Sequence, residues 1–153
     1  MTVRHFDVTD EAVAARVVQL QRAAYAVEAK LIGFDGIPPL HDTVADVQAH
    51  KIVWVGAFQG DNLVGGLGYS DDGPVRDIDR LFVDPAEARR GIGRALVSSV
   101  LDHPELHVST GAANHPAREL YESLGFVAAG QREIAVGVTV TSFVHRKEDA
   151  PAP

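Results

Sequence analysis

The sequence predicts an α/β protein in which a mixed, twisted sheet of about seven strands carries helices on both faces. Apolar runs of strand length alternate with segments of helical periodicity, and clusters of turn residues separate them. Their order is strand, two helices, three strands, helix, strand, helix and two strands. The chain of 153 residues shows neither an internal repeat nor a low-complexity linker, so residues 1–147 are predicted to form one domain.

The first part of the chain predicts a strand followed by a long helix. Val3 to Val8 alternate apolar and polar side chains, and Thr9 is the expected N-cap of the helix. Apolar residues every three or four positions predict the buried face of this helix: Val13, Val17, Leu20, Ala24, Val27 and Leu31. Gly33 ends it. Two prolines and two glycines predict irregular backbone in residues 33–40, before a short helix in residues 43–50.

The middle of the chain predicts three consecutive strands. Residues 52–58 and 63–69 form a hairpin around the turn at residues 60–62. Glycines in the second of these strands favour a bulge or close packing: Gly65, Gly66 and Gly68. A third, central strand contains the apolar run of Ile78, Leu81, Phe82 and Val83, and Asp84-Pro85 ends it.

The C-terminal part predicts a strand, a helix and a final pair of strands. The strand covers residues 106–110, and the helix covers residues 117–124, where Gly125 closes it. Residues 126–135 and 138–144 form the last pair of strands around Gly137. The tail, residues 148–153, is expected to be disordered.

A turn rich in glycine and arginine follows the central strand. Gly91-Ile92-Gly93 opens a helical pattern that continues to Leu101, and His103-Pro104 stops it. The free N–H groups at the start of a helix attract anions, and glycine removes the Cβ atoms that would keep a phosphate away. Three arginines bracket the glycines and add charged donors: Arg89, Arg90 and Arg94. The turn is predicted to bind a pyrophosphate.

Two familiar phosphate motifs do not fit this turn. A Walker A loop requires Lys and Ser or Thr after its last glycine, whereas Arg94-Ala95 follow Gly93. A dinucleotide fingerprint requires glycine where Leu96 stands. The turn instead resembles the acetyl-CoA loop of the GNAT superfamily of N-acetyltransferases, Gln/Arg-x-x-Gly-x-Gly/Ala. Gly91 and Gly93 match that loop, but Ala88 stands at its first position, and Arg89 or Arg90 are possible substitutes.

A second segment carries the same resemblance. Residues 114–126 match the GNAT pattern N-x-x-A-x-x-L-Y-x-x-x-G-F at every fixed position, and the predicted order of elements is also that of the GNAT fold. The resemblance implies an acetyl-CoA-dependent N-acetyltransferase acting on a primary amine, with a small molecule favoured over a peptide or protein as acceptor. The alternative is a GNAT-fold module that binds acetyl-CoA without turnover, as a sensor or interaction domain.

The resemblance also implies roles for individual residues. Residues of the central strand, the turn and the second motif would bind acetyl-CoA: Leu81, Phe82, Val83, Arg89, Arg90, Gly91, Ile92, Gly93, Arg94, Ala95, Asn114 and Tyr121. Tyr121 would be the general acid for the departing CoA thiolate. Alternatively, Tyr121 is only a core residue whose hydroxyl is hydrogen-bonded. Asn114 would contact the pantetheine arm or only cap its helix. A backbone N–H of Phe82 or Val83 would stabilise the oxyanion.

Candidates for the base and for acceptor binding are acidic. Alternation along the central strand predicts Asp77 and Asp79 on the face of Leu81 and Val83, as general bases or as solvated carboxylates. Relatives that acetylate ribosomal proteins place a glutamate where Ser109 stands, which weakens that substrate assignment. Four residues near the Pro-Pro loop are candidates for binding a cationic amine, against a plain solvated loop: Glu28, Asp35, His41 and Asp42.

Composition excludes several classes of function. The chain has no cysteine, so disulfides and thiolate sites are ruled out, and Pro104 separates His103 from His107, so no metal site is expected. A net charge of −7 argues against nucleic acid and favours a cationic acceptor. No apolar run approaches the roughly 18 residues of a membrane span. The N-terminus lacks an apolar signal core, from which a cytoplasmic protein is expected; a homodimer stays possible.

Overall fold

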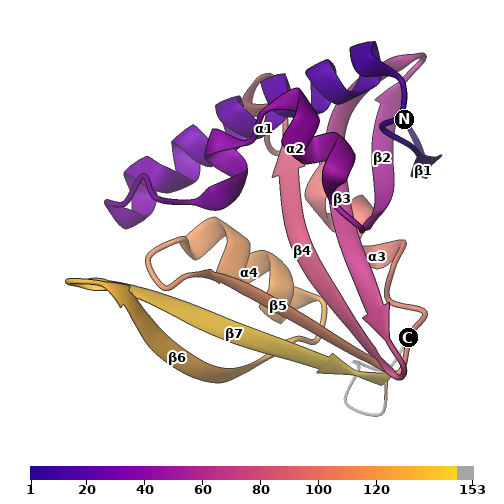
Figure 1. Ribbon diagram of the computed structural model, residues 1–153. Helices are drawn as coiled ribbons and strands as arrows, with labels where there is room; N and C mark the ends of the chain where they lie inside the picture. The colour runs from indigo at the N-terminus through magenta and orange to yellow at the C-terminus, as the bar shows by residue number, and fades with distance from the viewer. Residues whose placement is uncertain (148–153) are drawn as a thin grey trace.

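A seven-stranded sheet forms the centre of the computed structural model, which describes residues 1–147 (Figure 1). The strands are β1 (Thr2–Phe6), β2 (Val53–Gln59), β3 (Asn62–Asp72), β4 (Val75–Val83), β5 (Glu105–Gly111), β6 (Val127–Ala135) and β7 (Val138–Arg146). They lie in the order β1-β2-β3-β4-β5-β7-β6, and every neighbouring pair is antiparallel except β4 and β5. The predicted mixed sheet is confirmed. The tail of residues 148–153 lies outside the described residues.

Helices cover both faces of the sheet, as predicted. They are α1 (Glu11–Ile32), α2 (Val44–Ala49), α3 (Ile92–Ser98) and α4 (His115–Ser123), with short 3-10 helices η1 (Pro38–His41) and η2 (Pro85–Glu87). Adjacent residues of β2 point into two different cores. Trp54 packs with α1 and α2, whereas Val55 belongs to the core that α3 and α4 cover.

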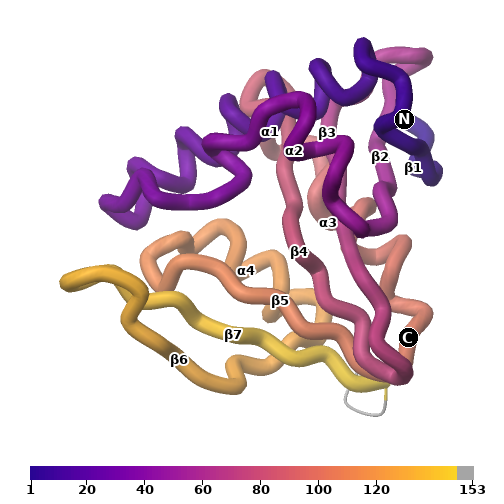
Figure 2. Tube along the Cα trace, in the orientation of Figure 1, coloured from indigo at the N-terminus to yellow at the C-terminus, as the bar shows by residue number. Residues whose placement is uncertain are grey.

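The sheet opens between its two parallel strands. Pairing of β4 with β5 is confined to Val75–Asp77 opposite Glu105–His107, and beyond these residues the strands separate (Figure 1). Helix α1 lies over this opening and bonds to both sides of it, through Tyr25 to β4 and through Glu28 to β5 (Figure 2). The opening exposes the edges of two central strands and therefore positions the candidate site.

Two details predicted for the N-terminal part are wrong. Strand β1 ends at Phe6 rather than Val8, because the Asp7 carboxylate accepts hydrogen bonds from the backbone and hydroxyl of Thr9 and turns the chain. Asp10, rather than Thr9, is the N-cap of α1, and its carboxylate accepts hydrogen bonds from the amides of Ala12 and Val13 at 2.8 and 3.3 Å.

The predicted buried face of α1 holds only for its first half. Val17 and Leu20 are buried, whereas Val27 and Leu31 are 48% and 45% exposed. From the middle of the helix onward the buried side chains are those of Gln21 and Tyr25. This half of α1 lies over the opening instead of the apolar sheet, so the face turned toward the protein there carries polar groups.

Other elements differ at their ends. The loop of residues 33–40 leads into η1, because proline is tolerated at the first positions of a helix. Helix α3 ends at Ser98 instead of reaching Leu101, and tighter i→i+3 bonds follow it, from the Val100 amide to Val97 at 3.1 Å and from the Leu101 amide to Ser98 at 3.4 Å. The predicted bulge and close packing in β3 are both present: Ala57 pairs with Gly65 and Phe58 with Leu63, which leaves Val64 as the extra residue, and a Cβ on Gly66 would lie 2.4 Å from the Phe82 ring.

Candidate active site

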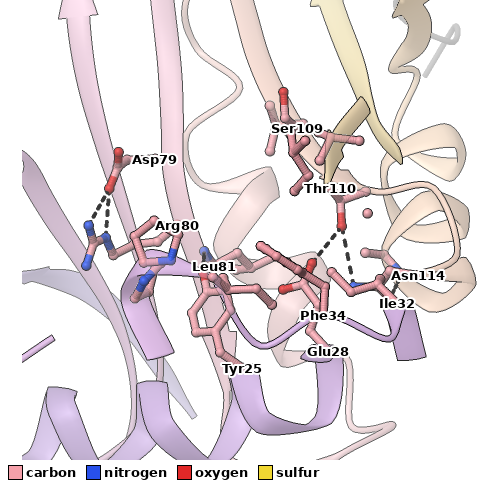
Figure 3. Close-up of a pocket in the computed structure, with 18 of the residues that line it drawn as sticks. Tyr25, Glu28, Ile32, Phe34, Asp79, Arg80, Leu81, Ser109, Thr110 and Asn114 are labelled. Atoms are coloured by element: carbon pink, nitrogen blue, oxygen red, sulfur yellow. Dashed lines mark hydrogen bonds and ion pairs between the residues drawn. The ribbon is translucent and has the colours of Figure 1, made fainter. Parts of the chain in front are cut away.

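Two cavities meet in the opening between β4 and β5. We call the first the loop cavity, of about 450 Å³, because the loop of residues 34–39 forms one wall; β4, β5 and the β6–β7 hairpin form the others (Figure 3). We call the second the turn groove, of about 520 Å³, because it runs along the turn between β4 and α3. Five residues line both, and we call them the junction: Tyr25, Glu28, Leu81, Asn114 and Ala117.

The turn groove follows the glycine turn predicted to bind a pyrophosphate. Gly91 is the N-cap of α3 with φ +75°, and no side chain bonds to the free amides there. A Cβ on Gly91 would meet no atom within 4 Å, so the space beside this turn is open. Gly91 therefore supplies a left-handed backbone conformation that other residues rarely adopt, and it leaves the adjacent amides accessible.

The three predicted arginines take different positions at the turn. Arg89 lines the groove and adopts φ +65°, the one positive φ of a non-glycine residue in the described chain. Arg94 also lines the groove and donates to the Ser123 hydroxyl at 2.6 Å. Arg90 is paired with Glu87 at 2.9 Å and, like Ala95, does not line the groove. Two of the three guanidinium groups thus lie beside the glycine turn.

Backbone amides of β4 face the opening in alternation. Asp84 donates its N–H to Val64 on β3, so the N–H of Phe82 faces β3 as well. The N–H groups of Leu81 and Val83 face the other way, and that of Leu81 donates to the Tyr25 hydroxyl at 3.1 Å. Of the two predicted oxyanion donors, only Val83 therefore presents its amide to the opening.

Two buried phenols lie beside the junction. Tyr121 from α4 packs its ring against Phe126 and Phe143 at centroid distances of 5.3 and 6.0 Å and lines the loop cavity but not the turn groove. No hydrogen bond to its hydroxyl is found among the described residues. Burial raises the pKa of Tyr25 and of Tyr121 above the usual value of 10.0, and the charge of Glu28 raises both further. Both phenols therefore keep their protons at neutral pH.

A chain of hydrogen bonds joins α4, β5 and α1 at the junction. Asn114 caps α4 by accepting the Ala117 amide at 3.3 Å and donates its own amide to the Thr110 hydroxyl at 3.4 Å. Thr110 in turn donates to the Glu28 carboxylate at 3.2 Å (Figure 3). Asn114 therefore caps its helix, one of the two roles that the sequence left open, and also lines both cavities; its contact with the pantetheine arm stays a prediction.

The predicted placement of Asp77 and Asp79 on one face with Leu81 and Val83 is wrong. Across the β3–β4 ladder, Tyr69 pairs with Ile78 and Gly68 with Arg80, which leaves Asp79 as the extra residue of a β-bulge. The bulge reverses the alternation, so Ile78 and Leu81 share one core and Asp77 points to the opposite face. Asp77 lies outside both cavities, 3.9 Å from His107, whereas Asp79 lines the loop cavity.

A buried polar network that sequence reasoning missed holds the loop wall. Arg80, with a side chain 4% exposed, pairs with Asp42 at 2.6 Å and with Asp79 at 2.7 Å. Gln21 donates to Asp42 at 3.2 Å and to the Pro39 carbonyl at 3.1 Å. The network ties the loop to α1 and β4. Its sequence signal is the polar series of α1, with Gln21, Tyr25 and Glu28 at helical spacing along one face.

The other predicted acceptor-side residues lie elsewhere. Glu28 is at the junction, but Asp35 and His41 are exposed and line neither cavity; the His41 ring bonds the Asp35 carbonyl at 2.6 Å. Within residues 1–147, no three His, Asp or Glu side chains cluster closely enough to hold a metal ion. None of the helices described is long and apolar enough to cross a membrane.

Comparisons with known proteins agree with this geometry. The model of the acetyltransferase (GNAT) family matches residues 15–126. The chain is 37% identical to protein YqkA of Bacillus subtilis over 135 residues, which cover 86% of this chain but only 39% of that protein. It is 33% identical to the N-alpha-acetyltransferase RimI of Mycobacterium tuberculosis, covering 73% of this chain and 75% of RimI. YncA of Salmonella typhimurium, solved with its cofactor acetyl-CoA, superposes with a TM-score of 0.72 at 18% identity, covering 100% of this chain and 97% of YncA.

Proposed function

Because the chain belongs to the acetyltransferase (GNAT) family, we propose that it transfers an acetyl group from acetyl-CoA to a primary amine. The observation that carries this proposal is the junction, where a groove beside a glycine turn meets a second cavity at five shared residues. A transfer between two substrates requires two binding sites that meet at the reacting atoms. The turn groove is the site for acetyl-CoA and the loop cavity is the site for the amine.

The residues of the turn groove fit acetyl-CoA. The open amides beside Gly91 and the guanidinium groups of Arg89 and Arg94 suit a pyrophosphate. The β4 segment from Leu81 to Val83 leads from this turn to the junction and suits the pantetheine arm. Exposed apolar side chains of α1, Val27 and Leu31, line the same groove and would be covered by the bound cofactor. The solved structure of YncA with its cofactor acetyl-CoA supports acetyl-CoA as the ligand.

The acceptor amine attacks the thioester carbonyl carbon at the junction. A C–N bond forms, and the carbonyl oxygen takes up negative charge that the Val83 N–H can stabilise. The C–S bond then breaks, and Tyr121 protonates the departing thiolate. Burial raises the pKa of Tyr121 and keeps the phenol protonated before transfer, as an acid requires, and the developing negative charge on sulfur then attracts the proton. We favour a small amine, since the loop cavity has the size of a small-molecule pocket.

Thermal-shift titration with acetyl-CoA, with ATP and NAD as controls, tests cofactor binding. A ligand at about 100 times its Kd adds about 2.7 kcal/mol of stability, which raises the Tm of a domain of this size by several degrees. We expect stabilisation by acetyl-CoA alone. CoA thiol release in the presence of small primary amines then tests transfer.

The second candidate is a module that binds acetyl-CoA without turnover. Ala88 favours it, because Ala88 lines the turn groove at the position where the family motif has Gln or Arg and offers no polar side chain. Stabilisation by acetyl-CoA without thiol release from any small amine or peptide N-terminus would favour this module. A shift with ATP instead would reject both candidates.

A further inference from the structure

One acidic side chain occupies the place where the two cavities meet. Among the described residues, Glu28 is the single Asp or Glu that lines both the loop cavity and the turn groove. Asp79 lines only the loop cavity, and Asp77 lines neither. On β5 the position beside Thr110 is Ser109, which has no basic group. A base able to act on an amine at the junction must therefore come from α1.

The hydrogen-bond chain from α4 orients this carboxylate. Asn114 donates to the Thr110 oxygen, so the Thr110 hydroxyl proton is free to be donated to Oε1 of Glu28. A carboxylate oxygen accepts hydrogen bonds, so the Thr110 hydroxyl holds Oε1 in place. Oε2 has no hydrogen bond in the part of the chain that the structure describes. One carboxylate oxygen is fixed, and the other is available to a substrate (Figure 3).

Charged and titratable groups from four elements surround Glu28. Tyr25 and Tyr121 lie close enough for its charge to raise their pKa values. On β4 the Arg80 guanidinium is paired with Asp42 and Asp79, and from β6 Arg132 lines the outer part of the cavity wall. No ion pair to Glu28 is found within residues 1–147. A substrate ammonium group would supply the missing countercharge.

We propose that Glu28 is the general base of the acetyl transfer, an inference that rests on the proposed function above. Glu28 takes one proton from the substrate ammonium group, and the freed lone pair forms the C–N bond. When the C–S bond breaks, the thiolate receives the Tyr121 proton. One of the two protons that remain on the attacking nitrogen then passes to the Tyr121 phenolate. Glu28 releases its proton to water, and the products are an amide, free CoA and one proton.

Glu28→Gln tests this role, with Glu119→Gln as the matched control. Glu119 is exposed on α4 and lines neither cavity. Thiol release is measured between pH 7 and pH 10.5 with a small primary alkylamine that the unchanged protein accepts. Near pH 7 we expect kcat/KM of Glu28→Gln to fall roughly 100-fold. Above the pKa of the amine, about 10.4, most of the amine is already deprotonated, so the loss of kcat/KM in Glu28→Gln should shrink to a few-fold. Glu119→Gln should follow the unchanged protein.

Two further readouts separate a base from a structural carboxylate. Acetyl-CoA should stabilise Glu28→Gln as much as the unchanged protein, and Glu28→Asp should keep the pH profile at a reduced rate. A Glu28→Gln deficit that is the same at every pH, or no deficit at all, would overturn the proposal while leaving the transferase intact. If the unchanged protein shows neither acetyl-CoA binding nor thiol release, the proposed function is wrong, and so is the role of Glu28 as its general base.

Discussion

The turn groove and the loop cavity are assembled in opposite ways. Most of the groove comes from one continuous stretch, residues 81–94, completed by α1 and α4. The loop cavity draws on widely separated segments: residues 25–39, 78–81, 108–111, 114–121 and 132–140. A single residue can therefore control the groove, whereas the cavity depends on contacts between distant elements. If this difference is real, substitutions on the two sides should affect different measured quantities.

The largest effect is expected at the boundary between the two regions. Tyr121→Phe removes the proposed acid but keeps the ring packing against Phe126 and Phe143. General acid catalysis contributes typically 10²–10⁴-fold, and we expect a loss of kcat of about that size. Acetyl-CoA affinity should be nearly unchanged, because Tyr121 does not line the groove. Steady-state thiol release and thermal-shift titration measure the two quantities.

Tyr69→Phe is the control for loss of a buried phenol. Tyr69 is also buried and lines neither the loop cavity nor the turn groove. Removal of the Tyr69 hydroxyl should leave kcat within a few-fold of that of the unchanged protein. Unchanged turnover in Tyr121→Phe would show that the acid is another group, and Tyr25 at the junction would be the next to test.

The turn groove could be located from the sequence because its determinants are local. Glycines at a strand-to-helix turn need no distant partner to be recognised, and the Asn114–Phe126 motif has fixed spacing. The order of elements and the mixed sheet were predicted from periodicity for the same reason. The placement of Asp77 failed because it depends on the bulge at Asp79 in the same strand, and a sequence pattern does not reveal where an extra residue interrupts the alternation.

The acceptor side was hidden because its contacts connect distant segments. Arg80 and Asp42 are 38 residues apart and look like ordinary surface charges in the sequence. The wrong N-cap of α1 has a local cause. Asp7, Thr9 and Asp10 all carry suitable oxygens, and the Thr9 hydroxyl donates to Asp7, which leaves Asp10 to cap the helix. Glu28 was one of four residues predicted to bind the acceptor, and its place at the junction follows only from the path of α1 over the opening.

The next largest effect should come from breaking the buried ion pair behind the loop wall. Arg80→Met leaves the Asp42 carboxylate, 11% exposed, without its guanidinium partner. Removing one partner of a buried pair costs about 3–5 kcal/mol, so the free energy of unfolding in urea should fall by that order. The loop should loosen, which raises KM for the amine and leaves acetyl-CoA affinity unchanged.

Two variants sharpen this test. Arg22→Met removes an exposed arginine that contacts the same segment only through a 3.5 Å bond to the Asp42 carbonyl, and it should change stability by no more than about 0.5 kcal/mol. Arg80→Met combined with Asp42→Leu should regain most of the lost stability, since no buried charge is left unpaired. A double variant as unstable as Arg80→Met would mean that packing of the arginine stem, and not charge pairing, holds the wall.

The smallest effect is expected from a single change in the groove, and it separates backbone strain from loss of binding. Gly91 and Gly73 both have positive φ, +75° and +58°, and a Cβ at either would meet no atom within 4 Å. Asp at each position should therefore cost a similar strain, about 1 kcal/mol. Only Gly91→Asp places a carboxylate beside the amides proposed to bind phosphate. Hydrogen bonds to charged groups contribute about 1.5–3 kcal/mol, so acetyl-CoA affinity should fall about 10–100-fold in Gly91→Asp and stay unchanged in Gly73→Asp. Equal losses in both would trace the effect to instability, and normal affinity in both would place the pyrophosphate elsewhere.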